Sequence, residues 1–217
     1  MQNDIILKTE NLGLNFSGRK LFCDLSFELL TGDSLCLSSP SGKGKTSLMG
    51  SIMGFISGFS GKIYICGLEH NKYNISAIRK KISWLPQNFN LQGRLTVEEA
   101  LTLPFAYPAN SRHRPSKENL VDELARLDLE ASILKNNFSQ ISGGEKQRIG
   151  LIICKLLKRP LLMLDEPTSA LDKNSKLRLI DYLVKPGDFA ILSASHDEDW
   201  VEACSKVIEL KGDCSDE

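Results

Sequence analysis

The feature that most constrains this chain is an apolar segment that leads into a loop of small residues and then into helix-forming residues. Residues 34–38 read Ser-Leu-Cys-Leu-Ser, and residues 39–46 read Ser-Pro-Ser-Gly-Lys-Gly-Lys-Thr. This order is typical of a buried strand, a phosphate-binding loop and the first turn of a helix. Gly42 and Gly44 allow the backbone to turn its N–H groups inward, and the helix N-terminus adds partial positive charge. The segment therefore predicts an anion site where a strand ends and a helix begins.

Two side chains of this loop suit a triphosphate bound with Mg²⁺. Lys45 is long enough to reach the β- and γ-phosphates, and the Thr46 hydroxyl is a suitable Mg²⁺ ligand. Ser39 stands where this pattern usually has its first glycine, so the loop must begin with an ordinary backbone conformation. A glycine-rich turn without a ligand is the alternative interpretation of this segment alone. The expected nucleotide-binding residues of the loop are Ser39, Pro40, Ser41, Gly42, Lys43, Gly44, Lys45, Thr46 and Ser47.

A second apolar run delivers two adjacent carboxylates. Leu161–Leu164 has no polar alternation, as expected for a strand covered on both faces, and Asp165 and Glu166 follow it. We expect Asp165 to hold the Mg²⁺ shell, through water, and Glu166 to orient or deprotonate an attacking water. The alternative is a helix N-cap after a core strand. The metal site is favoured because Lys45 and Thr46 require a carboxylate partner for the metal.

Apolar runs of four to six residues alternate with helical patterns along most of the chain, which predicts an α/β fold with a mostly parallel core sheet. Residues 26–30 and 62–66 look more like a half-exposed antiparallel layer. The expected strands are Ile5–Thr9, Ser26–Leu30, Ser34–Leu37, Lys62–Cys66, Ile82–Leu85, Leu161–Leu164, Phe189–Ser193 and Val207–Leu210.

The middle of the chain has a different pattern, in which helix signals replace strand signals. Thr96 and Glu99 have the spacing of a capping box, in which a hydroxyl and a carboxylate bond each other's backbone N–H groups. A second helix is expected after Ser116, where leucines recur at spacings of four and three residues. We expect a single domain, residues 1–217, whose body comprises residues 1–87 and 142–217 and whose helical subdomain is inserted at about residues 88–141.

Composition and charge limit the class of protein. The 217 residues carry 27 Lys and Arg against 27 Asp and Glu, a balance that argues against nucleic-acid binding through bulk positive charge. No pair of the six cysteines has the spacing of a zinc site or a redox motif. No run approaches the roughly 18 apolar residues of a membrane span, and the N-terminal residues lack the pattern of a signal peptide. We therefore expect an intracellular chain without a membrane span of its own.

The most specific motif is Ile-Ser-Gly-Gly-Glu-Lys-Gln-Arg at residues 141–148. Ser142 and Glu145 also form a capping box, and both interpretations can hold, because a capped helix N-terminus is an anion site. With this motif the chain resembles the ATP-binding cassette (ABC) ATPase family, over essentially its whole length from Ile5 to Leu210. It is similar to small bacterial export-type cassettes, which include lipoprotein-release and iron-export ATPases.

The resemblance implies roles for four more residues. Gln87 matches the glutamine that senses Mg²⁺ and the γ-phosphate, and His196 matches the histidine that bonds the γ-phosphate. Asp172 lies in a loop that crosses the dimer seam, and Phe16 occupies the position of the aromatic that stacks on adenine. The implied catalytic residues are Glu166, His196, Gln87 and Lys45. The implied further ATP contacts are Phe16, Ser142, Gly143, Gly144 and Asp172, and the implied Mg²⁺ ligands are Thr46, Gln87 and Asp165.

The resemblance also implies an assembly and a location. Two copies would enclose two ATP molecules with Mg²⁺, and residues 142–144 of each copy would complete the other's site. The expected homodimer would hydrolyse ATP to power an integral-membrane permease that docks near Phe89–Leu95. It would be cytoplasmic and peripheral on the inner (plasma) membrane, with no nucleic-acid partner. The alternative is a soluble ABC ATPase acting on nucleic acid or ribosomes, but those usually carry two cassettes or a long coiled-coil insertion.

Overall fold

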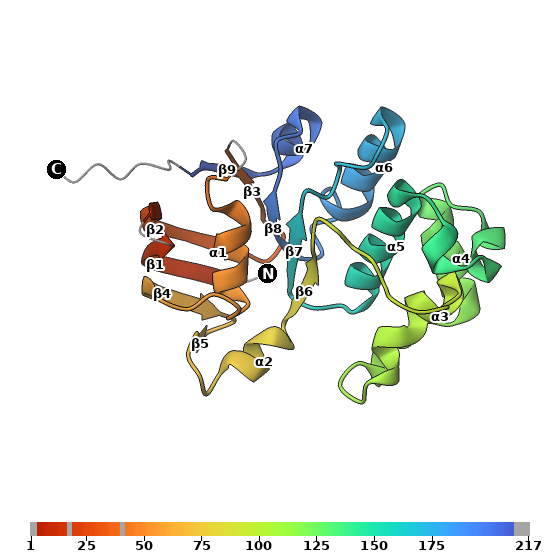
Figure 1. The fold of residues 1–217 in the computed structure, drawn as a ribbon, viewed down its shortest axis with the longest axis horizontal. Helices are drawn as coiled ribbons and strands as arrows, with labels where there is room; N and C mark the ends of the chain where they lie inside the picture. Colours follow the sequence, from red (N-terminus) through yellow and green to blue (C-terminus); the bar gives the residue numbers. More distant parts are fainter. Residues whose placement is uncertain (1–3, 17–18, 40–41, 211–217) are drawn as a thin grey trace.

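The computed structural model describes residues 4–16, 19–39 and 42–210, and at Phe16 and Arg19 the backbone alone. The described chain forms two β-sheets and a group of helices that lies at the end opposite the antiparallel sheet (Figure 1). The predicted α/β class, with a parallel core sheet and an antiparallel layer, is confirmed.

The core sheet is parallel, with the strand order β6-β7-β8-β3-β9. Its strands are β3 (Ser34–Ser38), β6 (Ile82–Leu85), β7 (Leu161–Asp165), β8 (Ala190–Ala194) and β9 (Lys206–Glu209). β7 and β8 are buried along their whole length, as their unbroken apolar sequences predicted. Because β3 and β7 flank β8 and run the same way, the segments that leave their carboxyl ends reach the same edge of the sheet.

The second sheet is antiparallel, with the order β2-β1-β4-β5. Its strands are β1 (Ile5–Phe16), β2 (Arg19–Leu30), β4 (Phe59–Ile65) and β5 (Leu68–Glu69). β1 and β2 are longer than predicted, and β5 was not predicted. Register shifts interrupt the pairing of β1 with β2, and Asn11 and Asp24 adopt left-handed φ angles of 47° and 49°. Such bulges break the two-residue alternation from which strands are recognised in a sequence.

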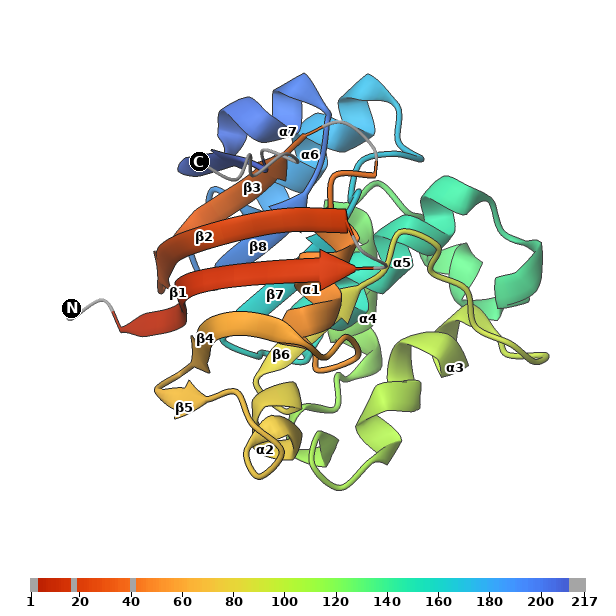
Figure 2. The same cartoon turned by 60° about the vertical axis from the view of Figure 1, so that its left-hand side comes forward.

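The helices divide between the two faces of the parallel sheet. α1 lies between the two sheets (Figure 2), where Leu48, Met49 and Ile52 pack against side chains of both. α5 packs on the opposite face, against the helices of residues 97–140. The α-helices are α1 (Lys45–Ile52), α2 (Ile75–Arg79), α3 (Val97–Thr102), α4 (Lys117–Arg126), α5 (Gly143–Leu156), α6 (Lys173–Leu183) and α7 (Glu198–Ala203). The 3₁₀ turns are η1 (Leu103–Ala106), η2 (Ser111–His113), η3 (Ala131–Lys135) and η4 (Phe138–Gln140). Across the described ranges, no helix combines the length and hydrophobicity needed to cross a bilayer.

The capping signals predicted for residues 97–140 are confirmed. The Thr96 hydroxyl accepts a hydrogen bond from the Glu99 N–H at 3.2 Å, and the Glu99 carboxylate accepts one from the Thr96 N–H at 2.7 Å. Ser116 caps α4 with its hydroxyl. The described structure of this segment is helical, with a single bridge between Thr96 and Asn137.

Gly61, in the antiparallel sheet, lies very close to the backbone of the neighbouring strand β1. Gly61 in β4 has a φ of 81°, and a Cβ at this position would lie 2.3 Å from the Asn11 carbonyl oxygen. Asn11 belongs to the bulge of β1, so the bulge and the glycine occupy the same point of the sheet. A side chain here would have to displace the neighbouring strand.

We predict that Gly61→Ala destabilises the chain more than Gly67→Ala does. Both glycines have left-handed φ angles, but a Cβ at Gly67 meets nothing within 4 Å. Conformational strain alone costs roughly 1–2 kcal/mol, and the clash at Gly61 adds about 1–3 kcal/mol. Urea unfolding of the two variants measures the difference. Equal losses of unfolding free energy in the two variants would show that β1 moves away from residue 61 at Asn11 without cost.

Candidate functional site

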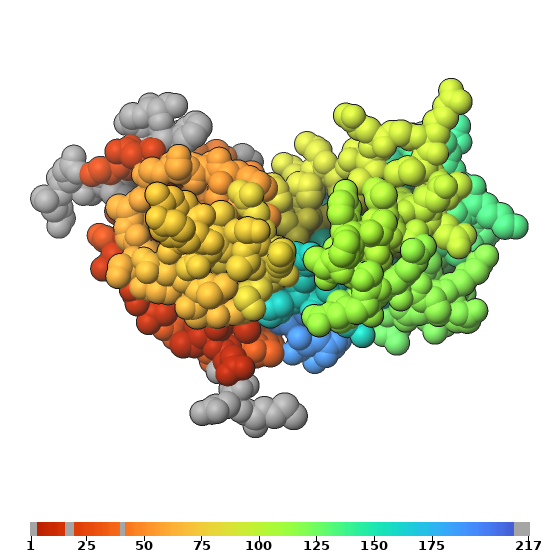
Figure 3. Space-filling view, turned by 90° about the horizontal axis from the view of Figure 1, so that it is seen from below, coloured from red at the N-terminus to blue at the C-terminus, as the bar shows by residue number. Residues whose placement is uncertain are grey.

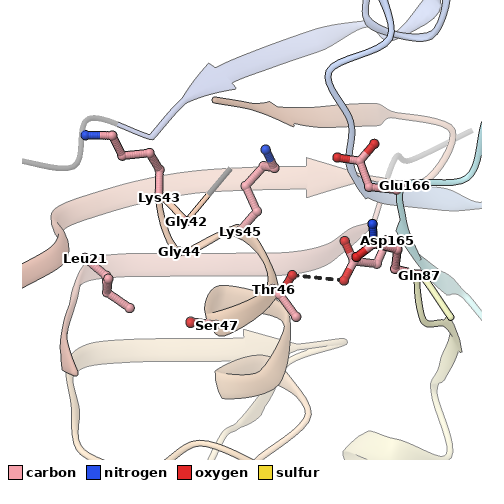
Figure 4. A pocket seen from close by; sticks show the side chains of 10 residues that line it. All are labelled: Leu21, Gly42, Lys43, Gly44, Lys45, Thr46, Ser47, Gln87, Asp165 and Glu166. Carbon is pink, nitrogen blue, oxygen red and sulfur yellow. Dashed lines mark hydrogen bonds between the residues drawn. The ribbon is translucent and has the colours of Figure 1, made fainter. Parts of the chain in front are cut away.

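Residues 42–47 of the predicted phosphate-binding loop line a cavity of about 360 Å³ at the carboxyl edge of the parallel sheet, and Ser39 is not among its lining residues. The loop between β3 and α1 forms one side, and the ends of β6 and β7 form the other (Figure 4). The lining residues are Leu21, Gly42, Lys43, Gly44, Lys45, Thr46, Ser47, Gln87, Asp165 and Glu166. The structure thus brings together side chains from four separate parts of the sequence.

The loop is built as its glycines predicted. Gly42 and Gly44 have φ angles of 79° and 92°, and Gly44 precedes α1 without a side-chain cap. The free N–H groups of the first turn of α1 are therefore available to an anion. Lys45 donates a hydrogen bond from Nζ to the Ser39 carbonyl, and the buried Ser39 hydroxyl has no hydrogen-bond partner among the residues that the structure describes. Pro40 and Ser41 lie outside the described residues.

A hydrogen bond joins the loop side of the cavity to the strand side. The Thr46 hydroxyl donates to Asp165 Oδ2 at 3.0 Å, between residues 119 positions apart (Figure 4). Burial raises the pKa of the Asp165 carboxyl, and the bond from Thr46 opposes that shift. Hydroxyl and carboxylate oxygens are the hard ligands that Mg²⁺ prefers. This donor set fits a magnesium ion shared with phosphate oxygens.

Glu166 follows β7 in an unusual conformation. Its φ is 49°, in the left-handed region that residues other than glycine rarely adopt. Its N–H donates to the Ala194 carbonyl at 2.8 Å, and its carboxylate Oε1 lies 3.0 Å from Nδ1 of His196. The Glu166 side chain is 10% exposed, whereas the His196 side chain is 74% exposed. The fold therefore places the shielded Glu166 carboxylate beside the accessible His196 imidazole.

Several predicted residues do not reach this cavity. Ser142, Gly143 and Gly144 lie at the start of α5, where Ser142 and Glu145 form the predicted capping box, and Asp172 caps α6. The Phe16 side chain lies outside the described part of the chain.

Leu21 is a lining residue that sequence reasoning missed. Leu21 comes from β2, and a Cβ added at Gly44 would lie 3.1 Å from the Leu21 Cβ. No motif or spacing connects residue 21 with the loop, because their contact results from the packing of the antiparallel sheet beside α1.

The capping box at α5 predicts a pH dependence of stability. Hydrogen bonds from the Ser142 side chain and backbone lower the pKa of Glu145. A depressed carboxyl pKa contributes stability above the unfolded value and loses it as the pH falls through the folded value. Relative to Glu145→Gln without nucleotide, the wild type should be more stable by about 0.5 kcal/mol at pH 7, the size expected for a partly exposed helix N-terminus. Thermal unfolding measured from pH 7 to pH 3 should show the two curves converging; a constant difference would contradict the assignment.

Comparison with known proteins identifies the family. Residues 22–169 match the family model described as ABC transporter. The chain is 32% identical over 213 residues to the probable iron export ATP-binding protein FetA of Escherichia coli (strain K12), covering 97% of this chain and 93% of that protein. It is 32% identical over 211 residues to the zinc import ATP-binding protein ZnuC of Wolbachia sp. subsp. Brugia malayi (strain TRS), covering 95% and 79%.

Solved structures agree on the fold. An ATP-binding subunit of an ABC transporter superposes with a TM-score of 0.83 at 24% identity, covering 95% of this chain and 86% of that one. A bacterial ABC transporter cassette, solved as a dimer, gives a TM-score of 0.80 at 22% identity and covers 95% of each chain. The family match spans more than half of the chain, and the resemblance carried by residues 141–148 is confirmed. This chain belongs to the ABC transporter family and is one of its ATP-binding subunits, an ATPase.

Proposed function

We propose that two copies of this chain bind two Mg²⁺–ATP molecules between them and use their hydrolysis to move a substrate through a separate membrane permease. The observation that carries the proposal is the division of the predicted residues into two surfaces. One set lines the cavity, and the other, at the start of α5, lies apart from it.

The residues that line the cavity supply the phosphate side of the site. N–H groups of the loop and of the first turn of α1 bind the phosphates, and the Lys45 ammonium pairs with the β- and γ-phosphates. Thr46 and Asp165, whose oxygens are 3.0 Å apart, hold the metal together with Gln87. A Mg²⁺ ion held by these residues would supply neutralisation of the phosphate charge.

Glu166 and His196 act on the attacking water and the γ-phosphate. The Glu166 carboxylate is shielded at the cavity wall, where it orients the water and accepts its proton. His196 is close enough to bond this carboxylate and exposed enough to turn to the γ-phosphate. His196 would bond the γ-phosphate when ATP is bound and the Glu166 carboxylate when it is not, so its position depends on the nucleotide.

The exposed start of α5 completes the site of a second copy. Ser142 and Gly143 are exposed, and a Cβ added at Gly143 would meet nothing within 4 Å. A helix N-terminus with this much open space accepts the γ-phosphate of a facing subunit. ATP then binds the closed dimer better than the open one, and a nearly complete shift needs about 5.5 kcal/mol of preference. Asp172, exposed at the start of α6, lies along the same seam.

The permease docks in a groove of 420 Å³ between the body and the helices of residues 97–140. Figure 3 shows this hollow between the yellow and green parts of the surface. Its lining is mostly apolar and includes Phe89, from the segment predicted to dock the permease, and the half-exposed Leu103. The described lining residues include the cations Arg79 and Arg159 but no carboxylate. These features suit an amphipathic helix that presents apolar and acidic side chains at the cytoplasmic face of the inner (plasma) membrane.

The cassette does not set the cargo under this proposal. The two relatives compared above are named for iron export and for zinc import, at the same 32% identity to this chain. Their shared ATP-binding fold thus serves both directions, and the permease selects the substrate.

We predict that Glu166→Gln retains ATP binding, loses turnover by 10²-fold or more, and forms a dimer that ATP stabilises. The amide keeps the shape of the side chain but cannot accept the proton of the water. Chromatography with Mg²⁺–ATP and phosphate release measure the two effects, and Lys45→Ala, which should not bind nucleotide, is the control. A Glu166→Gln chain that stays monomeric while it hydrolyses ATP normally would refute these roles.

The docking groove is tested with Leu103→Asp, which places a carboxylate among apolar and cationic residues. A permease copurifying with the tagged wild type in detergent should be lost from this variant, while the ATPase activity of the isolated chain is unchanged. Val207→Asp is the matched control, since Val207 is 49% exposed but lies on β9, away from the groove. Equal recovery of the permease with both variants would exclude the groove.

A further inference from the structure

We infer that Gln147 is a positioning residue for Glu166 and that it connects the catalytic carboxylate of each subunit to the helix that contacts the other subunit's nucleotide. The inference rests on the role proposed for Glu166. Gln147 lies on α5, five residues after Ser142, and is only 4% exposed.

The main chain of Glu166 is held from three directions. Gln147 donates from Nε2 to the Glu166 carbonyl oxygen at 3.1 Å, and the Ser169 hydroxyl donates to the same oxygen at 3.1 Å. On the other side, the Glu166 N–H donates to the Ala194 carbonyl at 2.8 Å. The backbone at Glu166 is thus fixed by α5, by the loop that follows β7 and by the end of β8.

This support matters because Glu166 has a left-handed φ of 49°. Residues other than glycine keep this conformation only where their surroundings hold it. Loss of the Gln147 donor would leave a buried carbonyl with one partner fewer and allow the backbone to relax. A relaxed backbone would carry the carboxylate away from Nδ1 of His196, which now lies 3.0 Å from it.

The same helix touches this loop at a second point. A Cβ added at Gly144 would lie 2.8 Å from the Ala170 carbonyl oxygen, so the first turn of α5 fits tightly against the residues after Glu166. A shift of α5 therefore has to move the loop or break the Gln147 bond. Because Ser142 at the start of α5 is proposed to contact the nucleotide of the partner subunit, closure at one site reaches the carboxylate of the other.

The test compares Gln147→Met, which keeps the length of the side chain without its donor, with Tyr182→Phe. Tyr182 also makes one buried side-chain hydrogen bond, to Glu123, but away from the cavity. Gln147→Met should lower kcat about 10- to 100-fold with KM and ATP affinity unchanged, the effect expected of a misplaced catalytic group. It should also accumulate the ATP-stabilised dimer. Tyr182→Phe should lower the unfolding temperature and leave kcat unchanged.

Two further variants keep the test decisive. Gln147→Asn retains the amide but withdraws it by one methylene, and it replaces Gln147→Met if that variant does not fold. Ser169→Ala removes the second donor, and its effect on kcat should depend on whether Gln147 is present, because both donors share one acceptor.

The outcomes distinguish a failure of the positioning role of Gln147 from a failure of the role proposed for Glu166. If Glu166→Gln turns over ATP like the wild type, the role of Glu166 is wrong. If Glu166→Gln is inactive while folded Gln147 variants keep the wild-type kcat, the positioning role is overturned. A parallel loss of ATP affinity and kcat in the Gln147 variants would also overturn it, since it would indicate a general structural role.

Discussion

The rest of the site depends on the strand order that brings Thr46 and Asp165 within hydrogen-bond distance. The two residues are 119 positions apart, and only a parallel sheet with β3 and β7 on either side of β8 brings them together. Burial of β7 and β8 fixes the distance, because their apolar side chains pack on both faces and leave no freedom to slide. The polar edge of the sheet is therefore as well ordered as its apolar centre.

Two features of the site oppose the stability of the fold. Asp165 carries a carboxyl group into a buried position, and Glu166 adopts a conformation that few side chains tolerate. Both lie at the end of β7, a strand buried along its whole length, where neighbouring elements supply the hydrogen bonds that hold them. Local strain placed on a rigid scaffold is typical of sites selected for chemistry.

Sequence predicted those parts of the fold whose signals are local. Apolar runs located the parallel strands, and the capping boxes at Thr96 and Ser142 located the starts of α3 and α5. The sequence could not show that Leu21 borders the cavity or that Gln147 supports Glu166, because both contacts join elements that meet only after packing. The bulges of β1 and β2 concealed seven of the twelve residues of each strand, since a bulge interrupts the two-residue periodicity by which a strand is recognised.

The position of α1 has a mechanical consequence. Six of its eight residues are buried, between one sheet that is parallel and another that is antiparallel. The loop proposed to bind the phosphates is therefore mounted on a tightly packed helix. Under the proposed function, movement on loss of the γ-phosphate would arise on the other face of the parallel sheet, where α5 and the helices beyond it belong to a different apolar cluster from that of α1. The proposed function thus assigns the two faces of one sheet different parts, with the phosphate-binding loop on the fixed face and the dimer-contacting helix α5 on the face that moves.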